Sequence, residues 1–281
     1  MEIFYPISCI GMIFSIIQIF LNFRIVLRYL LSSSTWKKND FKLITARTIL
    51  DIIVGLVAFT LFLVTMLCDL LPDIVPSESI FYVGLLASNI AIVRGLLAAS
   101  IAIERSCAIV FPLHFKQYRK VFTNLGFLTF FIFFAIFDDF MLLYVFDMEF
   151  PLKSDCRIYA CFIPRSYAKY ETIIFLIISL ITYFFSIFLS INMLIKYYRS
   201  VKLTNDMLKV NLLCITDLIC QISFEFIPAL IVQVVRIQNN VGPLMALLRS
   251  IGRVVEALSI FQLMRKNGSY GSARLAWETA S

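Results

Sequence analysis

Charged side chains stand inside long apolar stretches of this sequence, where each must find a partner or serve a function. The stretch 101–115 reads IAIERSCAIVFPLHF and contains an adjacent acid and base, Glu104 and Arg105. Such side chains can simply snorkel to water where an apolar helix ends, or they can hold each other as an ion pair. The choice between these two interpretations depends on the residues that follow Arg105.

Several more charges lie within apolar segments, among them Arg94, Asp139, Glu225 and Arg249. A charge at the centre of a membrane span costs about 2.5 to 3.5 kcal/mol on insertion scales, so such residues are expected to be paired or functional. One interpretation is that they form internal ion pairs that fix helix packing, for example Arg94 with Asp217 or Glu225.

The other interpretation is a ligand site. In it, Arg249, Glu225 and Asp139 line a pocket and meet a polar or anionic ligand, and Arg94 is a further candidate contact. Aromatic residues would supply the apolar walls, namely Phe81, Tyr82 and Phe226. The sequence leaves both interpretations open.

The composition indicates what must position these residues. Of the 281 residues, 60 % are hydrophobic and 15 % are charged, whereas a soluble domain has about 25 % charged residues, so lipid is the expected solvent. No lysine or arginine precedes Arg24, and the first apolar segment is therefore expected to be a retained membrane span and not a secretory signal. The net charge of +7 does not predict a nucleic-acid partner, because the cations lie in loops between apolar runs.

Seven apolar stretches are long enough to cross a bilayer, which takes about 20 residues of helix. Their approximate limits are 4–30, 47–70, 80–104, 123–146, 171–197, 207–235 and 241–264. Charges interrupt the last one, but the i, i+4 and i+7 spacing of Arg249, Arg253 and Glu256 places them on one helical face that a bundle interior can hide. We therefore predict an all-α membrane protein, one seven-transmembrane helix bundle over 1–264, followed by a short cytoplasmic tail over 265–281.

The loop charges predict the orientation of this bundle. Lysine and arginine collect in the first, third and fifth connections between the predicted spans and in the tail, whereas the second connection, LLPDIVPSES, has only acids. Such cations collect on the cytoplasmic side, so the N-terminus is predicted outside and the C-terminus in the cytoplasm. We find no convincing internal repeat; an inverted repeat would have indicated a secondary transporter.

The cysteines and the histidine predict no metal site and no other cofactor. The sequence has seven cysteines without a CxxC pair, and its single histidine is His114. Three cysteines, Cys68, Cys156 and Cys161, fall on the predicted outer side, where the environment is oxidising. One disulfide is expected, either between Cys156 and Cys161 or between Cys68 and one of these two.

The residues after Arg105 favour the ion-pair interpretation. Those at +3, +4, +7 and +8 are Ala108, Ile109, Pro112 and Leu113. This spacing resembles the (D/E)RYxxAIxxPL signature of rhodopsin-type G-protein-coupled receptors, although Ser106 replaces the usual Tyr and the seventh segment lacks NPxxY. The resemblance implies that Glu104 restrains Arg105 at rest and that Arg105 is released toward a G protein when the helices part. It also implies a coupling site that extends to Ile109, Pro112 and Leu113.

A closer resemblance covers nearly the whole chain. The segments SNIAIVRGLLAASIAIER, FDDFMLL, LLCITDLICQISFEFIPAL and QNNVGPLMALLRSIG are similar to the nematode serpentine chemoreceptors of the Srbc class, as is the cysteine pair in SDCRIYACFIP. The resemblance implies a chemosensory G-protein-coupled receptor that spans the plasma membrane of sensory neurons, including their cilia. Its implied partners are a small-molecule ligand, a heterotrimeric G protein and the lipid bilayer.

A transporter or ligand-gated channel is the alternative function, with the buried charges forming a translocation path. An intramembrane enzyme is disfavoured, because no His cluster, no pair of carboxylates beside a metal motif and no serine with a suitable base stands out. We therefore predict no catalytic residue.

Overall fold

The computed structural model of the chain describes residues 4–31, 42–71, 73–111, 124–148, 150, 156, 158–198, 212, 215–228, 231 and 242–278. Within these ranges every regular element is a helix and no strand occurs. The all-α prediction is confirmed for this part of the chain. Long apolar runs form helices in lipid because a helix satisfies each backbone N–H and C=O within its own segment.

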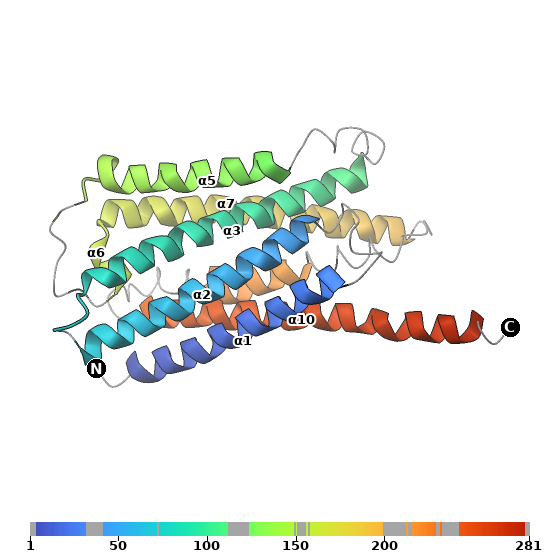
Figure 1. Cartoon of the computed structure of the whole chain (residues 1–281). Helices are drawn as coiled ribbons and strands as arrows, with labels where there is room; N and C mark the ends of the chain where they lie inside the picture. Colours follow the sequence, from blue (N-terminus) through green and yellow to red (C-terminus); the bar gives the residue numbers. More distant parts are fainter. Residues whose placement is uncertain are drawn as a thin grey trace.

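The helices run up and down beside one another (Figure 1). In chain order they are α1 (Phe4–Leu31), α2 (Lys42–Leu70), α3 (Glu78–Val110), α5 (Asn124–Phe140), the π-helix η2 (Met141–Val145), α6 (Tyr159–Phe162), α7 (Arg165–Tyr198), the π-helix η3 (Ile222–Phe226) and α10 (Gly242–Glu278). The π-helix η3 lies within a longer helical segment, residues 215–228. The start of α1 and the short α6 lie at one end of the bundle, and the end of α10 lies at the other (Figure 1).

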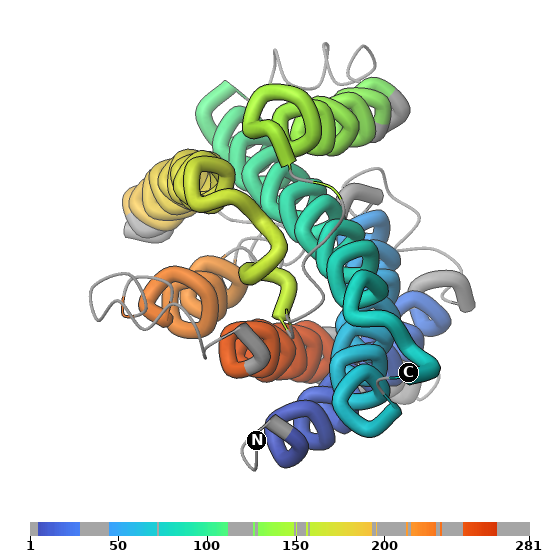
Figure 2. The backbone as a smooth tube through the Cα atoms, turned by 90° about the vertical axis from the view of Figure 1, so that its left-hand side faces the viewer, coloured from blue at the N-terminus to red at the C-terminus, as the bar shows by residue number. Residues whose placement is uncertain are grey.

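Helix α3 is the central element. It contacts α2, α5, α6 and α7, and it runs diagonally through the bundle when viewed from the end (Figure 2). Helix α10 contacts α1, α2 and η3. The described helices therefore surround an interior that α2, α3, α7, η3 and α10 all border.

Apolar packing concentrates in three clusters. The first lies around the start of α3 and α6 and comprises Ile80, Phe81, Leu142, Met148, Cys156, Phe162, Ile163 and Tyr167. The second joins α3, α5 and α7 and comprises Leu97, Ile101, Ile109, Phe131 and Leu189. The third joins α1 to α10 and comprises Ile25, Ala257 and Ile260. Buried polar side chains, among them Asp51, Arg94 and Glu256, lie in the interior beside these clusters.

Hydroxyl groups within the helices bond to their own backbone. Ser15 Oγ donates to the carbonyl of Gly11 at 2.9 Å, and Thr182 Oγ1 donates to the carbonyl of Ile178 at 2.8 Å. Each bond reaches one turn back along the same helix, so the hydroxyl needs no partner from solvent. This explains how serine and threonine are accommodated in such apolar segments.

Large apolar side chains also cover the outer faces of the bundle. Phe133 of α5 is 66 % exposed and Phe184 of α7 is 65 % exposed. Similar side chains stand along the outside of α1 and α2, for example Phe23 and Leu56. Soluble proteins rarely expose contiguous apolar surface of this extent, and lipid is its natural cover.

Four of the described helices are long and apolar enough to cross a membrane: Tyr5–Arg28, Thr45–Leu70, Glu78–Val110 and Arg165–Asn192. They coincide with the first, second, third and fifth predicted spans. Helix α5 has 17 residues, about 25 Å at 1.5 Å per residue, and depends on η2 for further length. Seven spans and the orientation of the termini stay predictions.

The structure covers the last two predicted spans to different extents. Of the sixth, 207–235, it describes residues 212, 215–228 and 231, and the rest lies outside the described residues. Helix α10 does not end near residue 264 but continues to Glu278, through most of the segment expected to be a tail.

Candidate functional site

A cavity of about 460 Å³ lies between α2, α3, α6, α7, η3 and α10. Its volume falls within the range of small-molecule sites. Helix α2 supplies an apolar wall that includes Val54, Leu61 and Phe62. The opposite side carries four charged residues, Glu171, Glu225, Arg249 and Arg253. The cavity therefore has an apolar part and a charged part.

Helix α6 covers the cavity at one end of the bundle. Tyr159 lines the cavity and stacks on Phe81, with the ring centroids 6.1 Å apart. Its ring lies so close to α3 that a Cβ added to Gly84 would come within 2.3 Å of Tyr159 Cδ2. Burial, together with the negative charge of Glu171, raises the pKa of Tyr159 well above its ordinary value. The phenol therefore stays protonated, and its buried hydroxyl has no hydrogen-bond partner among the described residues.

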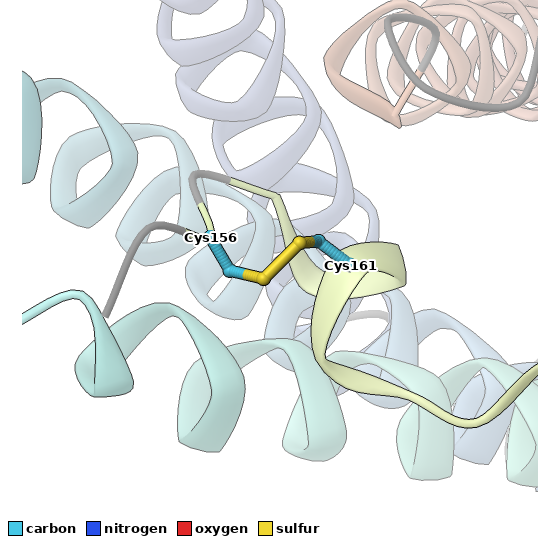
Figure 3. Close-up of a disulfide and its surroundings, with 2 residues drawn as sticks. All are labelled: Cys156 and Cys161. Carbon is cyan, nitrogen blue, oxygen red and sulfur yellow. A yellow bond between two sulfur atoms is a disulfide. The ribbon is translucent and has the colours of Figure 1, made fainter. Parts of the chain in front are cut away.

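A disulfide between Cys156 and Cys161 restrains this segment (Figure 3). Cys156 is buried in the first apolar cluster, whereas Cys161 is exposed. The bridge closes a ring that includes Ile158 and Tyr159, which both line the cavity. Of the pairings that the sequence left open, the structure contains Cys156 with Cys161, and Cys68 carries a free thiol.

Two arginines of α10 stand at the charged part of the cavity. The guanidinium carbon of Arg249 lies 5.7 Å from the ring centroid of Phe175. Arg253 Nη2 lies 3.8 Å from Glu225 Oε1, and Arg94 Nη1 lies 3.8 Å from the same oxygen. These distances exceed those of a hydrogen bond. Glu225 is therefore held by charge between two guanidinium groups and not by a fixed hydrogen bond to either.

A network of five charged side chains lies next to this part of the cavity. Arg94 Nε is 2.6 Å from Asp51 Oδ1, and Arg94 Nη2 is 2.6 Å from Glu256 Oε2. Arg47 donates to Asp217 and to Glu256. All five side chains are buried. The network thus joins α2, α3 and α10 to the segment 215–228.

Such a network is stable only when every member keeps its partner. Removing one member of a buried ion pair leaves an uncompensated charge, which costs about 3 to 5 kcal/mol. Gln18 of α1 adds a further contact, because its Nε2 donates to the backbone carbonyl of Asp51 at 2.7 Å. The polar interior therefore adds contacts between α1, α2, α3 and α10 to those made by apolar packing.

The structure brings together three of the four predicted ligand contacts. Glu225 and Arg249 line the cavity, and Arg94 lines a small adjoining hollow of about 20 Å³ with both of them and Arg253. Asp139 does not line the cavity. Its Oδ1 accepts a hydrogen bond from Asn89 Nδ2 at 2.8 Å, between α5 and α3.

The neighbouring Asp138 has a similar role. It is fully buried, and its Oδ2 accepts a hydrogen bond from Tyr167 Oη at 2.6 Å. The paired aspartates thus tie α5 to α3 and α7.

Of the three aromatic residues predicted to form the apolar walls, one lines the cavity and two do not. Phe226 lines the cavity. Phe81 is buried in the first apolar cluster and stands behind Tyr159, and Tyr82 is 60 % exposed. Phe81 and Tyr82 are consecutive residues of α3, so the helical turn directs one side chain into the bundle and the other outward. The sequence alone did not predict which of the two faces inward.

Glu104 and Arg105 lie near the other end of α3, away from α6. Arg105 is buried, and Ser106 Oγ donates to the backbone carbonyl of Phe185 at 3.0 Å. The serine that replaces the usual tyrosine therefore ties α3 to α7. Ile109 lies in the second apolar cluster. Pro112 and Leu113 lie outside the described residues.

Sequence reasoning missed several members of the site. Arg47 was not singled out and Asp51 was not assigned to the site, although their i, i+4 spacing places them on one face of α2, with Arg47 Nε 4.0 Å from Asp51 Oδ2. Asp217, one of the expected partners of Arg94, is paired with Arg47 instead. Glu171 was also missed; it accepts a hydrogen bond from Ser88 and lines the cavity.

Within the described ranges, no group of three or more histidine, cysteine, aspartate or glutamate side chains could hold a metal ion. The carboxylates of the buried network, Asp51, Asp217 and Glu256, pair with arginines.

A bundle of apolar helices, four of them long enough to cross a membrane, is typical of a helical membrane protein, and this one has a cavity of ligand size between its helices. Comparison with known families narrows this class. The model of the serpentine type 7TM GPCR chemoreceptor family Srbc matches residues 1–268, and the chain belongs to that family. It is thus a membrane protein of a chemoreceptor family and not of an enzyme family. No curated protein matches the chain.

Proposed function

We propose that the chain is a chemosensory receptor that binds a small molecule in the cavity and activates a heterotrimeric G protein. In this proposal seven helices cross the plasma membrane, the N-terminus lies outside, and the sensory-neuron cilium is a site of action. Membership of a chemoreceptor family supports the sensory role. The excess of loop cations on one side supports the orientation.

The contact between the cavity and the buried network carries the proposal. Glu225 lines the cavity, and it lies 3.8 Å from Arg94, which pairs in turn with Asp51 and Glu256. A ligand that displaces Glu225 therefore changes the electric field on ion pairs that join α2, α3 and α10. A receptor needs such a difference in contacts between its states, because a ligand shifts an equilibrium only by its differential affinity.

Helix α3 connects the cavity to the proposed coupling site. Gly84 borders the cavity, and Glu104 follows twenty residues later in the same helix, about 30 Å away at 1.5 Å per residue. We assign the switch to Glu104 and Arg105 and the coupling contacts to Ile109, Pro112 and Leu113. The Ser106 bond to α7 supports a switch here, because it must break if α3 and α7 separate.

A G-protein dissociation assay in cells, run with a panel of small molecules, tests the proposal. We expect a concentration-dependent response of the intact chain that Arg105→Ala abolishes at normal surface expression. Arg28→Ala is the matched control, because Arg28 is a cation in the last turn of another helix, α1. If Arg105→Ala responds as Arg28→Ala does, the coupling role of Arg105 is refuted.

A transporter or ligand-gated channel is the second candidate function, and the buried charges favour it. In that case a ligand evokes current or uptake in cells that lack the coupled G proteins, and Arg105→Ala leaves the signal intact. The mutual pairing of Arg47, Asp51, Arg94, Asp217 and Glu256 favours the receptor, because charges held by one another are poorly placed to bind a moving ion.

A further inference from the structure

The charged part of the cavity contains donor groups that lack acceptors. Arg253 is only 8 % exposed, and its Nε has no hydrogen-bond partner among the described residues. Its ion pair with Glu225, at 3.8 Å, is too long for a hydrogen bond. Within the described part of the chain, no carboxylate oxygen lies within 4.0 Å of Arg249, which rests against the ring of Phe175.

The inner arginines differ from this outer pair. Arg94 makes two bonds of 2.6 Å to carboxylates. Arg47 bonds two carboxylates directly, although its Nε also lacks a hydrogen-bond partner among the described residues. A guanidinium group in a low-dielectric interior is costly without such bonds, because each unsatisfied N–H loses its water. Arg249 and Arg253 thus have donors to spare, and both border the cavity.

We propose that the ligand carries a single acidic group that binds between Arg249 and Arg253, while its apolar body lies along the α2 wall. The inference rests on the proposed function, since it concerns the ligand of the same cavity. A guanidinium group presents parallel N–H donors that match a carboxylate. Residues one turn apart on α10, as these two arginines are, face the same side of the helix and can hold one group together.

The adjoining hollow supports the same placement. It is lined by Arg94, Arg249 and Arg253 with Glu225 as its single carboxylate. At about 20 Å³ it has room for a water-sized group but not for an apolar body. An acid at the inner end of the cavity would therefore lie at the mouth of a recess where three cations converge.

Glu225 becomes the competitor of the ligand in this arrangement. It lies 3.8 Å from both Arg94 and Arg253, so it can leave Arg253 and keep Arg94. A ligand acid that takes over Arg253 thereby shifts Glu225 toward the buried network. Neutralising Glu225 should strengthen binding of the acid, whereas neutralising either outer arginine should weaken it.

The test uses the purified full chain in phosphatidylcholine nanodiscs and measures its thermal unfolding midpoint with octanoate and with octanamide. The two probes share their chain and differ in charge. We expect octanoate to raise the midpoint by about 2 °C or more at saturation, as a ligand that binds only the folded state does. Octanamide should raise it by less than half as much. Equal shifts with both probes, or no Arg249-dependent shift with either octanoate or phosphatidylglycerol, would overturn the proposal.

Variants locate the effect. Arg249→Gln should abolish the octanoate shift, Arg249→Lys should retain part of it, and Glu225→Gln should give half-maximal stabilisation at roughly tenfold lower octanoate concentration. The last is a gain that misfolding does not produce. Lys169→Gln, which removes an exposed cation at the start of α7, controls for attraction to the protein surface. An octanoate shift that survives Arg249→Gln as well as Lys169→Gln would overturn the site.

A lipid can supply the same chemistry, and nanodiscs that contain phosphatidylglycerol separate the two sources. If only phosphatidylglycerol raises the unfolding midpoint in an Arg249-dependent way, the acid belongs to a membrane lipid. If octanoate does so, the acid belongs to a soluble molecule. Failure of the inference is distinguishable from failure of the proposed function. A chain that activates a G protein in response to amides or alcohols refutes only the acid, and a chain that binds octanoate without any G-protein response refutes only the receptor.

Discussion

The buried arginines of this bundle differ in how completely they are paired. Arg47 and Arg94 each bond two carboxylates, although Nε of Arg47 has no hydrogen-bond partner among the described residues. Arg249 and Arg253 border the cavity, and the structure gives neither a hydrogen bond to a carboxylate of the described residues. The ion-pair interpretation therefore describes the inner charges, which join the helices. The ligand interpretation stays a proposal for the two outer arginines.

Arg94→Leu is predicted to destabilise the fold strongly. It leaves Asp51 and Glu256 without their 2.6 Å partner, and breaking a buried pair costs about 3 to 5 kcal/mol. Thermal unfolding in detergent should show a lowered midpoint, and surface expression should fall several-fold. Arg24→Leu is the control, since Arg24 is exposed on α1 beside Phe20 and should cost about 0.5 kcal/mol or less. Equal midpoints for the two variants would contradict the network.

Gly84→Ala is predicted to disturb the cover of the cavity. The added Cβ would lie 2.3 Å from Tyr159 Cδ2, so the ring must move. We expect ligand potency to fall by about tenfold, a loss of about 1.4 kcal/mol, with surface expression kept. Gly95→Ala gives a graded comparison, because its Cβ meets only Ile178 Cγ2, at 3.2 Å. An equal effect of both substitutions would argue against a special role of the Tyr159 ring.

The sequence predicts which residues are buried better than it predicts their partners. The spacing of Arg249, Arg253 and Glu256 correctly indicated one shared inner face of α10, because helical periodicity is local. That Glu256 pairs with Arg94 depends on the rotation of two helices far apart in the sequence, which no local pattern contains. Arg47, the first residue of the predicted span 47–70, was not singled out, because its partners Asp217 and Glu256 lie far away in the sequence.

At the scale of elements, the α6 segment and its disulfide shape the cavity. The ring closed by Cys156 and Cys161 is short, and closing one of this length restrains the chain by about 2 kcal/mol. Three of the residues that line the cavity, Ile158, Tyr159 and Ala160, lie inside the ring. The disulfide therefore orders one wall of the site before a ligand arrives, which lowers the entropy cost of binding.

Replacing both cysteines of this bridge by serine is predicted to weaken ligand response without abolishing folding. The α6 segment gains freedom that the ligand must remove, so we expect roughly a tenfold loss of potency in the G-protein assay. Cys68→Ser should leave potency unchanged, because Cys68 has a free thiol outside the cavity lining. A larger loss with Cys68→Ser than with the double variant would mean that the bridge does not order the site.

The π-helix η3 is an element that the sequence did not indicate. It covers Ile222–Phe226 and carries Glu225 and Phe226 into the cavity wall. A π-helical turn takes in an extra residue and is frequent at functional sites. The long helices were predictable because a long run of apolar residues is visible in the sequence. A local change of helical pitch was not, because it depends on how the segment packs against α10.

For the whole molecule, the proposed topology requires that the chain cross the membrane an odd number of times. The start of α1 and the end of α10 lie at opposite ends of the bundle, in agreement with termini on opposite sides of a membrane (Figure 1). Four of the seven predicted spans coincide with described helices that are long and apolar enough to cross a membrane. Helix α10 is not among these four, and the buried Arg253 and Glu256 interrupt its apolar sequence.

Epitope tags at the two termini test the orientation. We predict that antibody stains the N-terminal tag on intact cells and the C-terminal tag only after permeabilisation, since loop cations collect on the cytoplasmic side. A cytoplasmic soluble protein expressed in the same cells checks that intact cells exclude antibody. Staining of the C-terminal tag on intact cells would reverse the topology and, with it, the coupling site at Arg105.

The central claim is that a small molecule in the cavity drives G-protein activation, and a blocked cavity tests it most directly. Ala91 of α3 lines both the cavity and its adjoining hollow, so Ala91→Phe should fill the space that a ligand needs. Leu86→Phe adds the same ring to the outer face of the same helix, where Leu86 is 50 % exposed. At equal surface expression we predict that Ala91→Phe loses the small-molecule response by tenfold or more, roughly 1.4 kcal/mol, while Leu86→Phe keeps it. An undiminished response of Ala91→Phe would contradict the account.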